Sequence, residues 1–157
     1  MSSYTNDGIQ IIPVKGIPEV SPGDDLAEMI VNSIDLLDGD VLVVIQKIVS
    51  KAENRLVKID SEIGHKPIVE KESVRILRRR GELIISETEH GFVCANAGID
   101  LSNVESGQAA LLPKFPDKSA KKIHDSLFHK HGVEVAVIIS DTFGRPWRRG
   151  VTDVAIG

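Results

Sequence analysis

The sequence has almost no cysteine and no excess of positive charge. Its one cysteine, Cys94, cannot form a disulfide within the chain, so a reducing compartment such as the cytoplasm is expected. Lys and Arg together number 19 against 23 Asp and Glu, which gives a formal net charge of -4. Proteins that coat nucleic acids are usually basic, so this class is not indicated.

Long apolar runs are also absent. Runs such as residues 135–139 are far too short to span a bilayer, and residues 1–7 lack the basic and apolar regions of a secretory signal. The hydrophobic fraction of 41% and the charged fraction of 27% are ordinary for a globular protein. A chain of 157 residues can bury its own core, so a single domain over residues 1–157, or a compact pair of lobes, is expected.

Hydrophobic patterning predicts strands and helices without a regular βαβ repeat. The predicted strands are 9–14, 41–45, 83–86, 92–95 and 133–140. One helix is predicted to begin at 22–24. A second is predicted from 66 to 80, and a third from 117–119 to about 130. The aliphatic run 41–45 is typical of a strand buried on both faces. Gly132 is expected to end the last helix. The class is therefore α/β (α+β) with a mixed β-sheet.

The common nucleotide-binding and zinc-binding motifs are missing, namely GxxxxGK[ST], GxGxxG and HExxH. The first candidate site is instead Asp141 and Thr142, at the carboxyl end of an apolar strand, where open α/β sheets place ligands. A carboxylate and a hydroxyl there could bind Mg²⁺ or Mn²⁺. The alternative is an aspartate that caps a turn.

A second candidate is the segment 96–103, which follows another predicted strand. Asp100 could bind a cation, Asn96 and Asn103 offer amide groups, and Gly98 leaves room for a ligand. The alternative is a loop whose side chains bond their own backbone. Carboxylates at two strand ends would suit a two-cation phosphate site.

Two basic segments complete the candidates. Three arginines within five residues, at 145, 148 and 149, could bind an anion, unless they form a solvated turn with Trp147 packed inward. Lys47 and Lys51 follow a predicted strand and could reach phosphates. Arg78–Arg80 is interpreted as a helix C-terminus, the histidines 124, 129 and 131 do not indicate zinc, and Cys94 is interpreted as a buried apolar residue.

Ordered blocks along nearly the whole chain resemble the coenzyme F-420:L-glutamate ligases, also called F-420-0:γ-glutamyl ligases. The blocks are PVKGIP at 13–18, PGDDL at 22–26, DGDVLVV at 38–44, KIVSKAE at 47–53, NAGIDLSNV at 96–104, LLP at 111–113, SDTFGRPWR at 140–148 and TDVAIG at 152–157. The resemblance implies a GTP-dependent amide ligase that adds L-glutamate to the deazaflavin coenzyme F-420-0 through an acyl phosphate. It also implies Mg²⁺ or Mn²⁺, K⁺ and a homodimer.

The resemblance implies roles for particular residues. Asp100, Asp141 and Thr142 would hold the divalent cations. The residues that would line the GTP site are Lys15, Gly16, Ile17, Pro18, Gln46, Lys47, Lys51 and Asn103. Arg145 and Arg148 are our own candidates for the phosphate of the coenzyme.

The sequence departs from the family at Gln46, where Ser or Thr is common, and at Asn54, where Gly is common. The family also continues beyond residue 157 with a further metal ligand and part of the GTP site. We therefore expect a C-terminally truncated, N-terminal portion of the fold, with incomplete metal ligation and little turnover unless a separate C-terminal piece joins it. The alternative is a non-catalytic nucleotide- or metal-binding homologue, or a dimerisation module.

Overall fold

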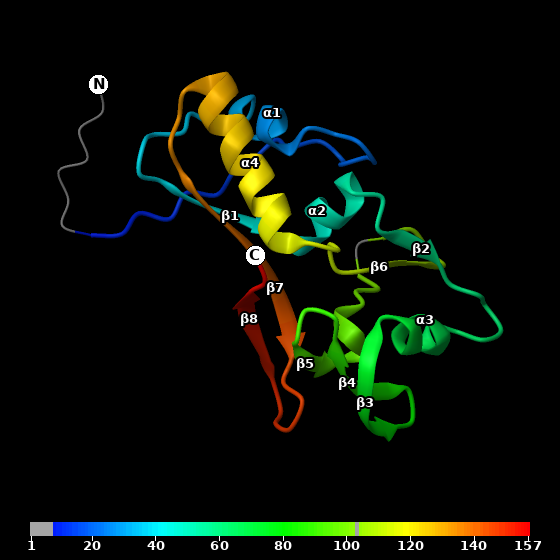
Figure 1. The fold of residues 1–157 in the computed structure, drawn as a ribbon. Coiled ribbons are helices and arrows are strands. Elements are labelled where there is room, and N and C mark those ends of the chain that lie inside the picture. Colours follow the sequence, from blue (N-terminus) through cyan, green and yellow to red (C-terminus); the bar gives the residue numbers. More distant parts are fainter. Residues whose placement is uncertain (1–7, 103) are drawn as a thin grey trace.

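The computed structural model describes residues 8–102 and 104–157 (Figure 1). The helices are α1 (Leu26–Val31), α2 (Gln46–Ala52), α3 (Lys66–Lys71) and α4 (Pro116–His131), with a 3₁₀ turn η1 (Asn96–Gly98). The strands are β1 (Val41–Ile45), β2 (Leu56–Lys58), β3 (Ser73–Arg80), β4 (Leu83–Thr88), β5 (Val93–Ala95), β6 (Gln108–Ala110), β7 (Ala136–Gly144) and β8 (Val151–Ala155). Within these residues no helix is long and apolar enough to cross a membrane.

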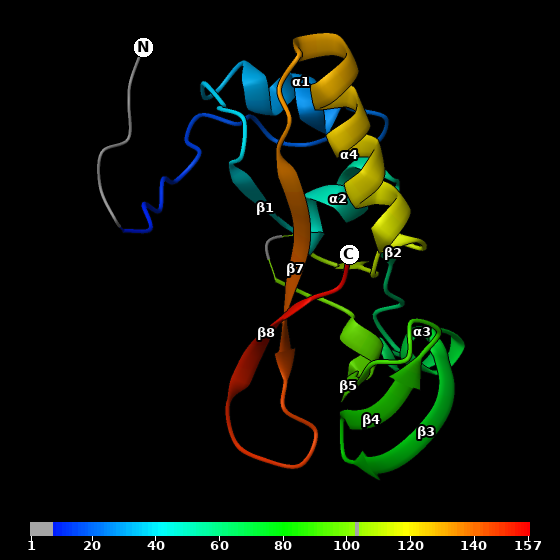
Figure 2. The same ribbon diagram turned by 60° about the vertical axis from the view of Figure 1, so that its left-hand side comes forward.

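The central sheet has the strand order β1-β7-β8 and is mixed, because β7 runs parallel to β1 and antiparallel to β8. Two antiparallel sheets, β2-β6 and β3-β4-β5, accompany it. Figure 2 shows helices α1, α2 and α4 around the upper half of β7, with β3, β4, β5 and α3 beside its lower half. The predicted α+β class with a mixed sheet is confirmed.

The main core lies between the central sheet and the helices. Leu127 of α4 and Ile139 of β7 are fully buried in it, together with Val49 of α2. Apolar residues of α4 recur at helical spacing on the buried face, as predicted. Gly132 ends α4 with a φ of 68°, a conformation that favours glycine. The helix begins at Pro116, however, slightly before the predicted start at 117–119, and no side chain caps it.

Strand β1 has the predicted bounds but not the predicted burial. Val41, Val43 and Ile45 are each 59% exposed, while the alternate residues Leu42 and Val44 are buried. The reason is that only one face of β1 meets the helices.

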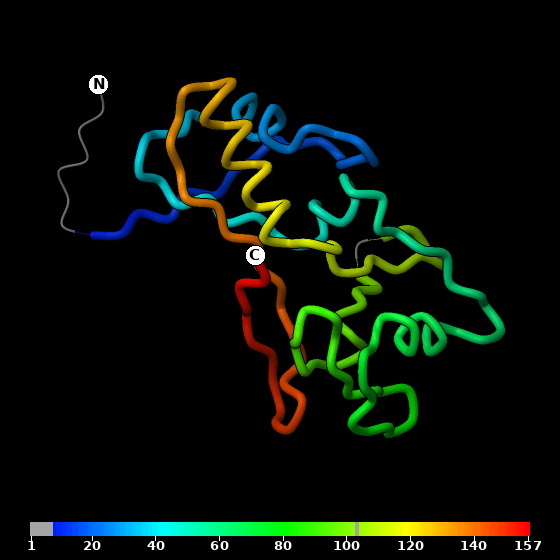
Figure 3. The backbone as a smooth tube through the Cα atoms, viewed as in Figure 1, coloured from blue at the N-terminus to red at the C-terminus, as the bar shows by residue number. Residues whose placement is uncertain are grey.

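Residues 9–14 do not form the predicted strand, and Ile9 and Ile11 are almost fully exposed. Figure 3 shows this segment running outside the packed elements. At the other end, Gly157 lies against Pro116, and its carbonyl oxygen accepts a hydrogen bond of 2.7 Å from the backbone N–H of Ile139.

The predicted helix over 66–80 is wrong in its second half. Helix α3 ends at Lys71, and β3 then pairs with β4 in an antiparallel hairpin. The hydroxyl of Ser73 donates to the carbonyl oxygen of Val69 at 2.6 Å, at the point where the helix gives way to the strand. Pairing with β4 therefore overrides the helical spacing, and Arg78–Arg80 lies on a strand and not at a helix end.

Candidate functional site

A cavity of about 650 Å³ lies beyond the carboxyl end of β1. The parallel pairing of β1 with β7 stops at Ile45 and Ser140, whereas β7 continues beside β8 to Gly144. Asp141 therefore lies inside β7, whereas the sequence had predicted that it follows the strand. It nevertheless sits just past the end of β1, at the edge where α/β sheets place ligands.

Acidic side chains from three segments line this cavity: Asp100 after η1, Asp141 of β7 and Asp153 of β8. Burial raises the pKa of Asp141, and the negative charge of Asp100 raises it further. The two carboxylates therefore interact electrostatically across the cavity. The backbone N–H of Thr142 donates to Oδ1 of Asp141 at 2.8 Å, and the Thr142 hydroxyl donates to Asp153 at 2.6 Å. The fold thus brings the two predicted carboxylates to one site.

Lys47 is held against Asp100 at the same cavity. Its ammonium lies 2.7 Å from Oδ2 of Asp100 and donates to the hydroxyl of Ser102 at 2.8 Å. Burial opposes ionisation of Asp100, but hydrogen bonds from Lys47 and Ser102 outweigh it, so the pKa of Asp100 falls below its ordinary value. Ser102 also donates to Oδ1 of Asp100 through both its hydroxyl and its backbone N–H.

Gln46, at the start of α2, is a buried polar residue in the cavity wall. Its amide nitrogen donates to Ser50 at 2.7 Å and to the carbonyl oxygen of Leu111 at 2.9 Å. Its Oε1 atom has no hydrogen-bond partner among the residues that the structure describes. This buried acceptor is therefore left unsatisfied by the described residues.

Gly98 and Asn96 line the cavity, but packing explains both residues. A Cβ atom on Gly98 would lie 2.9 Å from Leu112, and its φ of 70° favours glycine. Oδ1 of Asn96 accepts a hydrogen bond of 2.9 Å from the N–H of Ile84. Outside the cavity, Asn54 has a φ of 55°, a conformation that favours glycine.

Other predicted residues do not line the cavity. The turn 15–18 does not line the cavity, although Ile17 packs against the main core. Lys51 instead forms an ion pair with Glu19, just after that turn. Asn103 lies outside the described residues.

The arginine loop connects β7 to β8 as an exposed turn. The N–H of Arg145 donates to the carbonyl oxygen of Gly150 at 3.1 Å, which closes the loop. Arg145 and Arg148 are exposed and are not part of the cavity wall. Trp147 is 62% exposed, so the alternative in which it packs inward is wrong.

Sequence reasoning missed Asp153 and Ser102. Asp153 reaches the cavity because the β7–β8 register places it opposite Thr142. The antiparallel pairing of two apolar strands across the arginine turn was the available signal. Ser102 lies in the predicted loop 96–103, and an aspartate two residues before a serine is typical of a side chain that bonds the backbone ahead of it.

The donor set suits a hard divalent cation. Two carboxylates and a hydroxyl are oxygen ligands that Mg²⁺ and Mn²⁺ prefer, and water or phosphate oxygens commonly complete such sites. No cluster of three or more His, Cys, Asp or Glu side chains in metal-binding geometry occurs within residues 8–102 and 104–157. The protein residues described would therefore supply only part of a cation's ligands.

Known proteins resemble the chain along most of its length. It is 46% identical to the Coenzyme F420:L-glutamate ligase of Methanothermobacter thermautotrophicus, over 96% of the chain and 68% of that relative. The identities to the Coenzyme F420:L-glutamate ligases of Methanopyrus kandleri and Archaeoglobus fulgidus are 42% and 39%, each over 95% of the chain and 66% of the relative. The chain thus spans about two thirds of the length of these curated relatives.

The family described as F420-0:Gamma-glutamyl ligase matches residues 15–157. This match covers every element of the structure and the three acidic residues of the cavity. It confirms the resemblance that the sequence blocks indicated, and the chain belongs to the F420-0:gamma-glutamyl ligase family.

Proposed function

We propose that this chain carries the nucleotide- and cation-binding part of a GTP-dependent ligase that joins L-glutamate to coenzyme F-420-0. The observation that carries the proposal is the meeting of Asp100 and Asp141 at one cavity beside Lys47. The names of the relatives support the ligase and the two substrates. An acidic pair next to a lysine suits a triphosphate and its divalent cation.

Asp100, Asp141 and Thr142 would hold the Mg²⁺ or Mn²⁺ ion, which supplies charge neutralisation on the phosphates when it is bound. In the structure Lys47 forms an ion pair with the carboxylate of Asp100. Because a divalent cation competes for that carboxylate, its binding would free the Lys47 ammonium to contact a phosphate. Gln46, in the wall of the same cavity, would contact the nucleotide.

The reaction that fits this site has two steps. The carboxylate of F-420-0 attacks the γ-phosphorus of GTP, which gives an acyl phosphate and releases GDP. The amine of L-glutamate then attacks the acyl carbon, an amide forms, and phosphate leaves as the amine loses a proton. Positive groups placed around the phosphates stabilise the charge that moves in the first step.

The remaining parts of the proposal concern segments outside the cavity wall. Lys15, Gly16, Ile17, Pro18, Lys51 and Asn103 would complete the GTP site. Arg145 and Arg148, on the exposed β7–β8 turn, would contact the phosphate of the coenzyme. K⁺ as a further cation, a homodimer and a separate C-terminal piece belong to the same proposal.

A second function, binding of nucleotide without catalysis, is favoured by the incomplete acidic ligand set of the described residues. One assay separates the two functions. The chain is incubated with GTP, Mn²⁺, F-420-0 and L-glutamate, and products are measured by mass spectrometry while GTP binding is measured by calorimetry. A glutamylated product supports the ligase, and GTP binding without product supports the second function. The absence of both contradicts the two functions together.

A further inference from the structure

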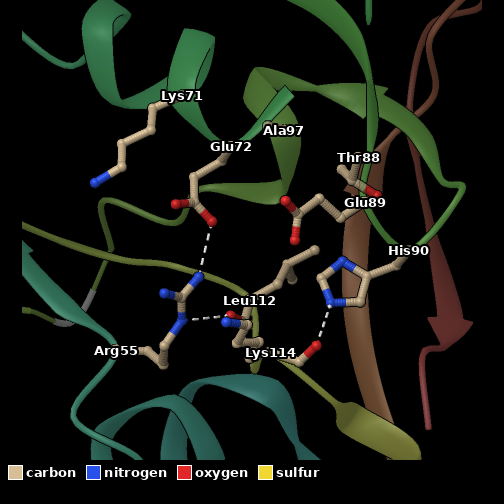
Figure 4. Close-up of a pocket in the computed structure, with 9 residues that line it drawn as sticks. All are labelled: Arg55, Lys71, Glu72, Thr88, Glu89, His90, Ala97, Leu112 and Lys114. Atoms are coloured by element: carbon tan, nitrogen blue, oxygen red, sulfur yellow. Dashed lines mark hydrogen bonds and ion pairs between the residues drawn. The ribbon is translucent and has the colours of Figure 1, made fainter. Parts of the chain in front are cut away.

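A second cavity, of about 240 Å³, lies on the other side of the η1 turn (Figure 4). Ala97 lines this second cavity, whereas its neighbours Asn96 and Gly98 line the first. The two cavities therefore lie on either side of η1. The volume of the second cavity is just below the range of about 300–1,000 Å³ that is typical of drug-sized ligands. A metabolite of the size of an amino acid would fit it.

One ion pair forms part of the cavity wall. Nη2 of Arg55 lies 2.7 Å from Oε2 of Glu72, and Nε of Arg55 donates to the carbonyl oxygen of Leu112 at 3.0 Å. Figure 4 shows this pair on the side opposite Glu89 and His90. Because these two charges satisfy each other, the other ionisable groups of the wall determine which ligand is attracted.

One side of the cavity offers hydrogen-bond acceptors. Nε2 of His90 lies 2.9 Å from the carbonyl oxygen of Pro113, and since a carbonyl only accepts, Nε2 carries the hydrogen. Nδ1 of His90 is buried, without a partner among the described groups, and in the neutral ring it is an acceptor. Glu89, next to it on the β4–β5 turn, makes no ion pair within the described part of the chain. These two groups suit an ammonium.

Two lysines of the wall supply uncommitted positive charge. Lys71 ends α3 and Lys114 precedes α4, and neither forms an ion pair with another described residue. The Lys114 ammonium lies 5.7 Å from the ring centroid of Phe115, which leaves its hydrogen-bond donors available. Lysine ammonium groups suit carboxylates, and with Arg55 paired to Glu72 the wall keeps one more cation than anions.

We propose that this second cavity binds an acidic α-amino acid, and specifically L-glutamate. Lys71 and Lys114 bind its two carboxylates, while Glu89 and Nδ1 of His90 accept hydrogen bonds from its ammonium. The ligand has one ammonium and two carboxylates, so its charges match the charges of the wall. The choice of glutamate among acidic amino acids rests on the proposed function.

The test is a titration of the whole chain with L-glutamate, followed by calorimetry and by amide chemical shifts, with and without Mn²⁺ and a non-hydrolysable GTP analogue. We expect shifts at residues 88–90, at Leu112 and at Lys114, and about tenfold weaker binding in Lys71→Gln and in Lys114→Gln. Lys118→Gln is the matched control, because this exposed lysine is near Phe115 but outside the cavity. It should bind L-glutamate as the unaltered chain does.

Glutarate, which lacks only the amine of glutamate, tests the acceptor side. It should bind more weakly than L-glutamate to the unaltered chain, and Glu89→Gln should reduce this difference. Equal affinity for the two ligands, shifts confined to the cavity of Asp100, or no binding at millimolar glutamate in any condition would each overturn the proposal. Binding of Mn²⁺ and GTP is measured in the same samples. If L-glutamate binds as expected but Mn²⁺ and GTP do not bind, the proposed function is contradicted and the amino-acid site is still supported.

Discussion

The ammonium of Lys47 and the carboxylate of Asp100 meet at 2.7 Å, although they come from the start of α2 and from the loop after η1. The lysine side chain is 13% exposed and the aspartate side chain 28% exposed, so the pair is partly shielded from water. In the proposed function a divalent cation needs the same carboxylate. The pair is therefore a competitor of the cation, and this gives the first prediction.

Replacing Lys47 by Met should increase the affinity for Mn²⁺ in the absence of nucleotide. A partly exposed ion pair contributes up to about 1 kcal/mol, which corresponds to about fivefold in affinity. Calorimetry or the paramagnetic relaxation of water protons measures the change. Lys122→Met, at an exposed position of α4, is the control. Weaker Mn²⁺ binding in the Lys47 variant would show that the two cations do not compete.

Asp25, the N-cap of α1, forms an ion pair with Lys130 of α4. It accepts a hydrogen bond of 3.1 Å from the N–H of Ala27 as the N-cap of α1, and its Oδ2 lies 2.7 Å from the ammonium of Lys130. Asp25→Ala should lower the free energy of unfolding by about 1 kcal/mol, as measured by urea denaturation. Asp35→Ala, at an exposed position, should change it little.

This contribution depends on pH in a known direction. The hydrogen bond from Lys130 is the main reason that the pKa of Asp25 lies below its ordinary value of 3.8. The stabilisation is therefore present above pH 3.8 and is lost as the pH falls through the lower pKa of the folded chain. The difference in stability between the unaltered chain and the Asp25 variant should shrink in acid. A difference that grows in acid contradicts this sign.

Gly98 and Gly107 allow a controlled test of packing. Both have a positive φ, of 70° and 81°, but only at Gly98 would a Cβ atom meet a neighbour, Leu112 at 2.9 Å. Gly107→Ala should lower the free energy of unfolding by about 1–2 kcal/mol through the backbone alone. Gly98→Ala should lower it by about a further 1–3 kcal/mol, because Leu112 must move. Equal losses in urea denaturation would show that Leu112 yields without cost.

Cys94 should be unreactive in the folded chain. It is fully buried, and this burial, helped by the charge of Asp141, raises the pKa of its thiol to about 11. Since the thiolate is the reactive form, iodoacetamide at neutral pH should label the folded chain far more slowly than the chain in urea. Equally rapid labelling in both conditions would place the thiol at the surface.

The sequence predicted the elements that depend on short-range patterns. The bounds of β1 match the aliphatic run, the predicted strands 83–86 and 92–95 are present as β4 and β5, and Gly132 caps the end of α4. The change from α3 to β3 could not be predicted, because it depends on pairing with β4, which local spacing does not contain. The exposed face of β1 was missed for a similar reason, since the packing of helices on one face of a strand or on both is a property of the whole fold.

The candidate site, too, could be predicted only in part. Asp100 and Asp141 could be chosen from their places after apolar segments, but only the fold shows that one cavity holds them both. The partner of Lys47 was not predictable, because no spacing rule links α2 to the loop after η1. The second cavity gathers residues from five separate segments, among them Arg55, Lys71, His90 and Lys114, and no motif in the sequence marks it.

The most direct test of the account is Mn²⁺ binding to the unaltered chain and to Asp141→Asn, measured by calorimetry with and without GTP. The asparagine keeps the size of the side chain and removes its charge, and Asp35→Asn controls for the loss of one surface charge. We predict that the unaltered chain and the Asp35 variant bind Mn²⁺ equally, and more tightly with GTP, while the Asp141 variant binds at least about tenfold more weakly. Unchanged Mn²⁺ affinity in the Asp141 variant would contradict the assignment of this cavity to a cation and its nucleotide.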